Sequence, residues 1–298
     1  MMRVMTIISI GELLWDVFED SESLGGAPFN FACHASRLGH EVIFVSAVGD
    51  DARGAAAIAK ASGVGLRTEF IQVVPGAPTG TVSVRVDSAG QPDFTIHRPA
   101  AYDAMRLGAA GCERLAAMRP EWLYCGTLYQ TEPCGRAEVA KLAGALPGVK
   151  RFYDINLRRD SYSRGLLADL LPTAGVVKLN DDEALVIDSL FGCRHDSLAE
   201  FTDFWSRKFA WSAVAVTRGS RGCAVRVGAD YAEPAGYAVT VADTVGAGDA
   251  FAAGFLHGLA QGWDAQQTGD FANRVGAVVA ARRGGVPPWS MADVAALR

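Results

Sequence analysis

The stretch Asp243-Thr-Val-Gly-Ala-Gly-Asp-Ala-Phe-Ala-Ala-Gly-Phe255 decides the fold, because it joins an apolar run with strand character, 237–242, to a helix of small residues. Gly246 and Gly248 therefore fall at a helix N-terminus, where free backbone N–H groups and the helix dipole favour an anion. Asp249 places a carboxylate beside that anion. Two interpretations follow: an anion site with an acid that can deprotonate a hydroxyl, or glycines that only open a helix with an acidic first turn.

Composition places the chain among globular α/β proteins. It has 298 residues, half of them hydrophobic, and a net charge of -5, with no basic patch to suggest a nucleic acid or a membrane as partner. The six cysteines show no CxxC pairing and no metal-like cluster with the five histidines, so we expect reduced thiols in a cytoplasmic protein. No segment reaches the length of a membrane span, and no P-loop, GxSxG or HExxH motif is present.

Strand-like and helical runs alternate along most of the chain, which predicts a doubly wound, mostly parallel central sheet with helices on both faces. No linker or repeat divides the chain, so residues 1–298 are expected to form a single domain. The predicted strands are 4–10, 42–48, 122–125, 152–153, 176–179, 213–217 and 223–227, and the predicted helices are 28–39, 52–61, 105–118, 133–145, 181 onward, 250–260 and 271–282.

One region breaks this alternation. Between residues 67 and 98, three strand-like runs (69–74, 80–86 and 93–97) are separated by turn sequences, among them Asp87-Ser-Ala-Gly90. We expect an antiparallel insertion that pairs with residues 12–24 and lies over a cleft as a lid. A small sheet with one apolar face is poorly stable alone, so it would close on the cleft or pair with a second subunit in a homodimer.

Polar residues follow several predicted strands directly. Asp154, Asn156 and Arg158 follow the strand that ends near Tyr153, where ligands collect in an open parallel sheet, although a surface turn would also explain them. Asn180 and Glu183 follow the next strand at the spacing of a helix capping box, which satisfies a helix end without further function. Asn30 lies in the first turn of the helix after Gly25-Gly26, where a local cap would equally account for it.

These motifs together resemble the ribokinase-like (PfkB) carbohydrate kinases, in family order and over nearly the whole chain. The matching stretches are Gly25-Gly-Ala-Pro-Phe-Asn30, Asp154-Ile-Asn-Leu-Arg158, Lys178-Leu-Asn-Asp-Asp-Glu183, Val216-Thr-Arg-Gly-Ser-Arg-Gly222 and Asp243-Thr-Val-Gly-Ala-Gly-Asp249. The resemblance implies an ATP-dependent phosphotransferase with a central doubly wound sheet and a β lid, and with a sugar bound between the lid and the sheet.

The resemblance also implies roles for individual residues. Asp249 matches the catalytic base, and Gly246, Ala247 and Gly248 match the anion hole for the transferred phosphoryl group. Substrate ligands are expected at Asp16, Gly26, Asn30, Arg98, Asn156 and Arg158, and nucleotide contacts at Asn180, Thr217, Gly219, Gly222 and Asn273. Glu183 matches a residue that holds magnesium through water. ATP and Mg²⁺ are the implied cofactors, with a monovalent cation such as K⁺ as an optional third.

The sugar is decided by finer features. Ribokinase-type members carry a lysine after the paired glycines, whereas this chain has Ala27-Pro28 as fructokinase-like members do, so fructose is the expected substrate. Arg98 could instead pair with a carboxylated sugar, which makes a 2-keto-3-deoxygluconate kinase, or another sugar or nucleoside kinase of the family, the alternative. A non-catalytic sugar-binding protein is the alternative of a different class, and the intact Asp249 argues against it.

Overall fold

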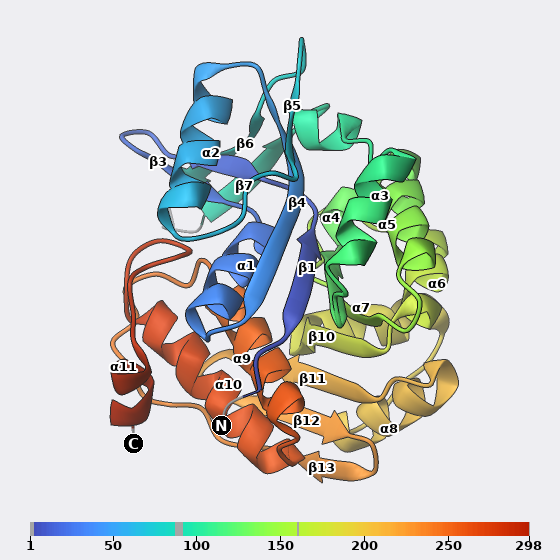
Figure 1. Ribbon diagram of the computed structural model, residues 1–298. Coiled ribbons are helices and arrows are strands. Elements are labelled where there is room, and N and C mark those ends of the chain that lie inside the picture. Colours follow the sequence, from blue (N-terminus) through green and yellow to red (C-terminus); the bar gives the residue numbers. More distant parts are fainter. Residues whose placement is uncertain (1–2, 87–91, 160, 298) are drawn as a thin grey trace.

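The structure is a computed structural model that describes residues 3–86, 92–159 and 161–297. A nine-stranded sheet runs through it in the order β13-β12-β11-β10-β9-β8-β1-β4-β5 (Figure 1). Neighbouring strands are parallel from β11 to β5, and β12 and β13 are antiparallel at one edge. The strands are β1 (Thr6–Ile10), β4 (Glu41–Gly49), β5 (Ile71–Val74), β8 (Trp122–Gly126), β9 (Lys150–Asp154), β10 (Val176–Asn180), β11 (Ala213–Thr217), β12 (Cys223–Val227) and β13 (Asp230–Ala232).

Helices cover both faces of this sheet, as predicted. One face packs against α1 (Ala27–Arg37), α2 (Ala52–Gly63), α9 (Ala247–Gln261), α10 (Ala265–Ala280) and α11 (Met291–Ala296). The other packs against α3 (Ala109–Ala117), α4 (Thr127–Gln130), α5 (Pro133–Ala145), α6 (Arg164–Leu170), α7 (Asp181–Phe191) and α8 (Leu198–Phe209). Short 3₁₀ turns are η1 (Ala101–Ala104), η2 (Leu171–Thr173) and η3 (Gly219–Arg221). No helix in the described ranges is long and apolar enough to cross a membrane.

Alternation along the buried strands divides the core into two halves. Phe152 and Val176 point to the face covered by α1 and α9, whereas Tyr153 and Val177 point to the opposite face. Small residues bring α9 and α10 close together, because a Cβ on Gly254 would lie 3.0 Å from the Cα of Ala272. This packing holds the N-terminus of α9 close to the carboxyl ends of the strands, with Gly248 beside Lys178 of β10.

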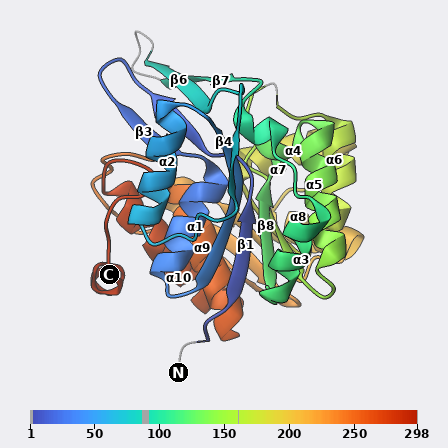
Figure 2. The same cartoon turned by 45° about the horizontal axis from the view of Figure 1, so that its top comes forward.

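A second sheet of four strands, in the order β3-β2-β6-β7, lies at the end of the main sheet toward which β1 and β4 run (Figure 2). Its strands are β2 (Leu14–Val17), β3 (Glu22–Gly25), β6 (Gly80–Val86) and β7 (Pro92–His97). The predicted pairing of the 80–97 hairpin with residues 12–24 is present, but β2 runs parallel to β6 and not antiparallel. The predicted turn at 87–90 lies outside the described residues.

The strand predicted at 69–74 was assigned to the wrong sheet. As β5 it pairs in parallel with β4, through Ser46 opposite Ile71 and Gly49 opposite Val74, at the edge of the main sheet. The reason is that β1 covers one edge of β4 and leaves the opposite edge open, where another strand can extend the sheet. The small sheet therefore does not include residues 67–79.

The strand predicted at 237–242 is absent, because the chain leaves the sheet after β13. It crosses the end of α10 instead, where the amides of Ala242 and Asp243 both donate to the carbonyl of Ala280. Val241 is 58 % exposed there, so the β-branched run has no sheet to enter. Helix boundaries also differ: residues 105–118 form only α3 after η1, and α10 begins at Ala265, where Asp264 and Gln267 form a capping box.

Candidate active site

The N-terminus of α9 has the geometry that the sequence predicted. Gly246 is the N-cap, with a left-handed φ of 77°, and a Cβ at that position would lie 2.2 Å from the carbonyl oxygen of Gly285. The conformation and the close packing both require glycine. Gly248 and Asp249 fall in the first turn, where helix N–H groups have no intrahelical acceptor. The turn therefore presents amides to an anion beside a carboxylate.

Asp249 is almost completely buried, and Asn30 Nδ2 on α1 donates to its Oδ2 at 2.8 Å. Burial raises the pKa of Asp249 to about 6, with the nearby Asp154 acting in the same direction, while Lys178, the Asn30 hydrogen bond and Arg158 oppose the rise. The helix dipole is therefore not the dominant influence on this group. The carboxylate is mostly ionised at neutral pH and is a stronger base than an exposed aspartate.

Three buried polar residues lie on the strands of this face of the sheet. Sequence reasoning placed Asp154 where ligands collect but assigned neither Tyr124 nor Lys178 to the site. Tyr124 on β8 donates its hydroxyl to Asp154 Oδ2 on β9 at 2.9 Å, and Lys178 Nζ on β10 lies 3.1 Å from Asp154 Oδ1. Strand alternation points all three side chains toward α9, as it does Phe152 and Val176. The available signal was a lysine and an aspartate in otherwise apolar, fully buried strands.

The side of Asp249 that faces the small sheet, here called the sugar flank, is crowded with carboxyl groups. Asp16 lies on β2, and a Cβ on Gly25 would come within 2.8 Å of its Oδ2, so the paired glycines make room for it. Gly26 has a φ of 110°, and a Cβ there would lie 2.5 Å from the carbonyl oxygen of Glu12. Burial raises the pKa of Asp16 to about 6, although Arg158 opposes the rise.

Glu12 is a further residue of the sugar flank that sequence reasoning missed. It follows β1 directly and is buried, and its Oε2 has no hydrogen-bond partner among the described residues. Burial raises the pKa of Glu12 to about 7, despite hydrogen bonds from its own amide and that of Ala27 and the charge of Arg158. The charge of Asp249 also raises the pKa of Glu12, by less than burial does, so the carboxyl groups of Glu12 and Asp249 lie near each other.

Arg158 is exposed and faces the same space as these acids, since its charge lowers the pKa values of Glu12, Asp16 and Asp249 alike. Asn156 stands at the turn before it with a left-handed φ of 39°. Glu183 Oε1 accepts from the amide of Leu157 at 2.6 Å and ties this turn to α7. The structure thus places Asn156 and Arg158 just beyond the carboxyl end of β9, and the charge of Arg158 acts on Asp249.

The other side of Asp249, the nucleotide flank, lies at the ends of β10 and β11. Asn180 and Thr217 are opposite each other in register, and Asn180 forms with Glu183 the predicted capping box of α7, with bonds of 2.7 and 2.8 Å. Gly219 and Gly222 have φ values of 57° and 88° in the following loop. Glycine is required at 222, where a Cβ would lie 2.2 Å from the carbonyl oxygen of Pro234.

Asn273 on α10 supports this loop from behind. Its Nδ2 donates to the carbonyl oxygens of Pro234 and Ala235, both at 3.1 Å, and Pro234 in turn accepts from the amide of Cys223. The buried amide therefore fixes the backbone of the nucleotide flank. A nucleotide contact by Asn273 stays a prediction.

Arg98 is a predicted site residue whose guanidinium is held by other groups of the chain. It forms an ion pair with Asp103, and its Nη1 donates to the Leu128 carbonyl at 3.2 Å and to Thr131 Oγ1 at 2.5 Å. With Nε also bonded to Asp103, the guanidinium has its donors engaged away from Asp249. A role for Arg98 in binding a substrate stays a prediction.

The fit of a magnesium ion was tested on Glu183. Both carboxylate oxygens already accept backbone amides, Oε1 from Leu157 and Oε2 from Asn180, and the side chain is buried. Within the described residues no group of three or more His, Cys, Asp or Glu side chains could hold a metal ion. The residues therefore do not fit direct ligation of magnesium by a protein cage, and a contact of Glu183 with magnesium through water stays a prediction.

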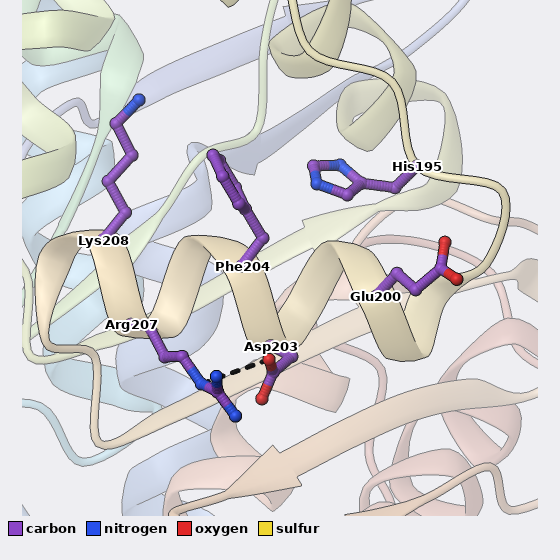
Figure 3. A pocket seen from close by; sticks show the side chains of 6 residues that line it. All are labelled: His195, Glu200, Asp203, Phe204, Arg207 and Lys208. Carbon is purple, nitrogen blue, oxygen red and sulfur yellow. Dashed lines mark ion pairs between the residues drawn. The ribbon is translucent and has the colours of Figure 1, made fainter.

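A hollow on the surface is unrelated to this site. It is lined by side chains of α8 and of the loop before it: His195, Glu200, Asp203, Phe204, Arg207 and Lys208 (Figure 3). Helix α8 covers the face of the sheet opposite α9, and none of the predicted site residues lines the hollow. The chemistry is therefore assigned to the strand ends and not to this depression.

A buried acid beside helix amides, placed at the carboxyl ends of a doubly wound sheet, defines a class of enzyme that transfers an anionic group to a hydroxyl. Comparison with known proteins narrows the class. Residues 5–291 match the model of the pfkB family carbohydrate kinases. The chain belongs to this family and is a carbohydrate kinase, which confirms the family predicted from the motifs.

Individual relatives agree with this assignment. A probable fructokinase-5 from Arabidopsis thaliana is 27 % identical, covering 94 % of this chain and 93 % of the relative, and a fructokinase from Escherichia coli is 29 % identical, covering 84 % and 83 %. A solved structure of a sugar kinase from Pyrococcus horikoshii in complex with ATP is 28 % identical, with a TM-score of 0.79 over 94 % of this chain and 93 % of that chain. The predicted fold class is confirmed.

Proposed function

We propose that this protein is an ATP-dependent kinase that phosphorylates fructose. The observation that carries the proposal is the buried carboxylate of Asp249, which accepts from Asn30 on the sugar flank and stands one residue after Gly248 in the first turn of α9. A sugar hydroxyl beside Asp249 can lose its proton to the carboxylate while its oxygen bonds to the terminal phosphorus. The bond from that phosphorus to the bridging oxygen breaks, and ADP leaves.

The chain's own groups supply position and charge. The amides at the start of α9 stabilise the negative charge on the phosphoryl oxygens, and Asn30 holds the Asp249 carboxylate in place. A Cβ on Gly219 would meet nothing within 4 Å, so this loop leaves room for a nucleotide near the ends of β10 and β11. A magnesium ion, when bound, would neutralise charge on the phosphates, with Glu183 as the residue that could hold it through water.

Fructose is proposed on two grounds. Position 27 is an alanine and not a lysine, and Pro28 is fixed in place, since its carbonyl accepts from Ser9 Oγ at 2.7 Å. Two of the relatives named above are fructokinases. A 2-keto-3-deoxygluconate kinase is the second candidate, and one observation favours it: Arg158 is exposed beside the site and could pair with a sugar carboxylate.

A kinase screen with fructose, ribose, 2-keto-3-deoxygluconate and adenosine tests the proposal. Fructose should give the highest kcat/KM. A clear lead for ribose or adenosine would contradict the choice of sugar, and a lead for the keto-deoxy acid would select the second candidate. An ATPase assay with and without sugars separates both from a non-catalytic sugar-binding protein, in which no sugar would stimulate turnover.

We also propose that the small sheet is a lid over the sugar. The support is Asp16, which lies on β2 of this sheet while its carboxyl group is within the influence of Asp249 and Arg158. A homodimer through the same sheet is the other way to cover it. Solution scattering with and without sugar tests both ideas, because a monomer that does not become more compact would contradict both.

A further inference from the structure

Lys178 is a buried ammonium beside the proposed anion hole. It belongs to β10, and alternation along that strand points it toward the N-terminus of α9. A Cβ built on Gly248 would lie 3.2 Å from its Nζ, so the absence of a side chain at 248 lets the ammonium approach the backbone of the first turn. The lysine and the helix amides therefore converge on the same point.

The hydrogen bonds of Lys178 leave donor capacity unused. Among the described residues its Nζ contacts only Asp154, at 3.1 Å to Oδ1 and 3.3 Å to Oδ2, whereas an ammonium has three N–H groups. Asp154 also accepts from the Tyr124 hydroxyl, which fixes the carboxylate and through it the ammonium. At least one N–H of a rigidly held, buried cation thus remains for another acceptor.

The charges around Asp249 show why such a cation is needed. Asp154, Glu183, Asp16 and Glu12 are carboxyl groups near the base, and the positive groups that act on Asp249 are Lys178 and Arg158. Arg158 is exposed and lies with the sugar flank, so a phosphoryl group that approaches the amides of α9 meets Lys178. Burial alone would lower the pKa of Lys178, but Asp154, Glu183 and Asp249 outweigh it, and the pKa is raised.

We propose that Lys178 is a catalytic residue that donates a hydrogen bond to the transferred phosphoryl group, as a side-chain member of the anion hole. The inference rests on the proposed kinase function. Lys178 gives up no proton: the proton of the sugar hydroxyl goes to Asp249, the phosphorus bonds to the sugar oxygen, and the ammonium stabilises the charge on the phosphoryl oxygens as the bond to ADP breaks.

A single Lys178→Met variant leaves the Asp154 carboxylate buried without its cation and can fail to fold for that reason. The decisive variant is the double replacement Asp154→Asn with Lys178→Met, which removes both charges and keeps an acceptor for Tyr124. Asp154 raises and Lys178 lowers the pKa of Asp249. Removing both charges together therefore cancels two opposite effects on the base. Lys141→Met is the matched control, since Lys141 pairs with the buried Glu138 at 2.7 Å on the opposite face of the sheet.

The double variant should fold, and its kcat should fall about 10²- to 10³-fold, the cost of removing one anion-hole donor, with little change in KM for the sugar. Calorimetry adds a readout without turnover: affinity for the β,γ-imido analogue of ATP should fall about tenfold or more, while affinity for ADP stays within about twofold. Lys141→Met should behave as wild type in both measurements.

Either of two results would overturn the proposal: a double variant with kcat within about threefold of wild type, or equal losses of affinity for ADP and the analogue. Each result would mean that Lys178 only neutralises the buried Asp154 and does not contact the phosphoryl group. Failure of the proposed function is distinguishable, because the wild-type enzyme would then phosphorylate no sugar in the screen, while the two nucleotide titrations still compare wild type with the variant.

Discussion

The two flanks of Asp249 are built on opposite plans. On the sugar flank, buried polar atoms are left without partners: Oε2 of Glu12 and Oδ1 of Asn30 have none among the described residues. On the nucleotide flank, the side chains assigned from the sequence are bonded to the chain itself, as Asn180 and Glu183 are in their capping box and Asn273 is to Pro234 and Ala235. Arg218 is an exception, with an unpartnered Nε.

This difference helps to distinguish residues that contact a ligand from residues that position the backbone around it. An unpartnered buried polar atom is costly in the free protein, so two such atoms beside Asp249 favour groups that meet a substrate or a proton. A fully bonded side chain such as Asn273 stabilises loops whose backbone makes the contacts. Substitutions on the sugar flank should therefore reduce activity more than stability, and substitutions on the nucleotide flank should do the reverse.

The largest expected effect is that of Asp249→Asn, at the junction of the flanks. Loss of general-base catalysis should reduce kcat by about 10² to 10⁴. Sugar and ATP affinity should fall much less, because the amides of α9 remain and the new amide oxygen can still accept from Asn30. Measuring kcat, both KM values and thermal stability on one preparation decides the matter. A stable variant with near wild-type kcat would remove Asp249 from the catalytic machinery.

The class of fold and the anion hole could be predicted from the sequence because they depend on local signals. Gly246 and Gly248 stand between an apolar run and a run of small residues, which indicates a helix start, and alternation of buried strands with helices indicates a parallel sheet. The run 237–242 misled for the same reason, since β-branched residues indicate an extended chain but not a neighbouring strand to pair with.

Contacts between distant segments could not be predicted in this way. Nothing in the local sequence tells that Lys178 reaches Gly248 or that Glu12 lies near Asp249. Each depends on which strands are neighbours and on which face a side chain lies. The family resemblance identified the positions that meet ligands, but not the buried charges that set their pKa values.

A second prediction concerns Glu12 and tests whether a buried acid on the sugar flank lowers the stability of the folded protein when it ionises. The pKa of Glu12 is raised in the folded protein from about 4.5 to about 7, so the folded state holds the proton more tightly than the unfolded chain. Its contribution to stability is complete below pH 4.5 and is lost as the pH rises through about 7. Glu12→Gln imitates the protonated acid and should gain stability over wild type as the pH rises from 5 to 8, by at most about 3 kcal/mol.

Denaturant unfolding of both proteins at several pH values measures this difference. Glu138→Gln is the matched control, because Glu138 is equally buried but already paired with Lys141 and with the amide of Leu107. It should be destabilised without gaining stability at high pH. If the difference in free energy of unfolding between Glu12→Gln and wild type did not change with pH, the pKa of Glu12 would not be raised in the folded protein. The contrast between the two flanks would then lose one of its supports.

The smallest effect is expected on the nucleotide flank, from Glu183→Gln. Two amides, of Asn180 and Leu157, donate to the two carboxylate oxygens, and a glutamine has one acceptor, so the free energy of unfolding should fall by about 1–3 kcal/mol. If Glu183 also holds magnesium through water, loss of its charge should raise the Mg²⁺ concentration needed for half-maximal rate.

Helix α10 offers the comparison, because its capping box uses the uncharged Gln267 with Asp264 and still closes the helix end. A cap therefore does not require the charge of Glu183. Gln267→Ala should lose stability without any change in magnesium dependence. An unchanged magnesium requirement in Glu183→Gln as well would leave Glu183 as a tie between α7 and the turn at Leu157, a residue that supports the site without touching the reacting groups.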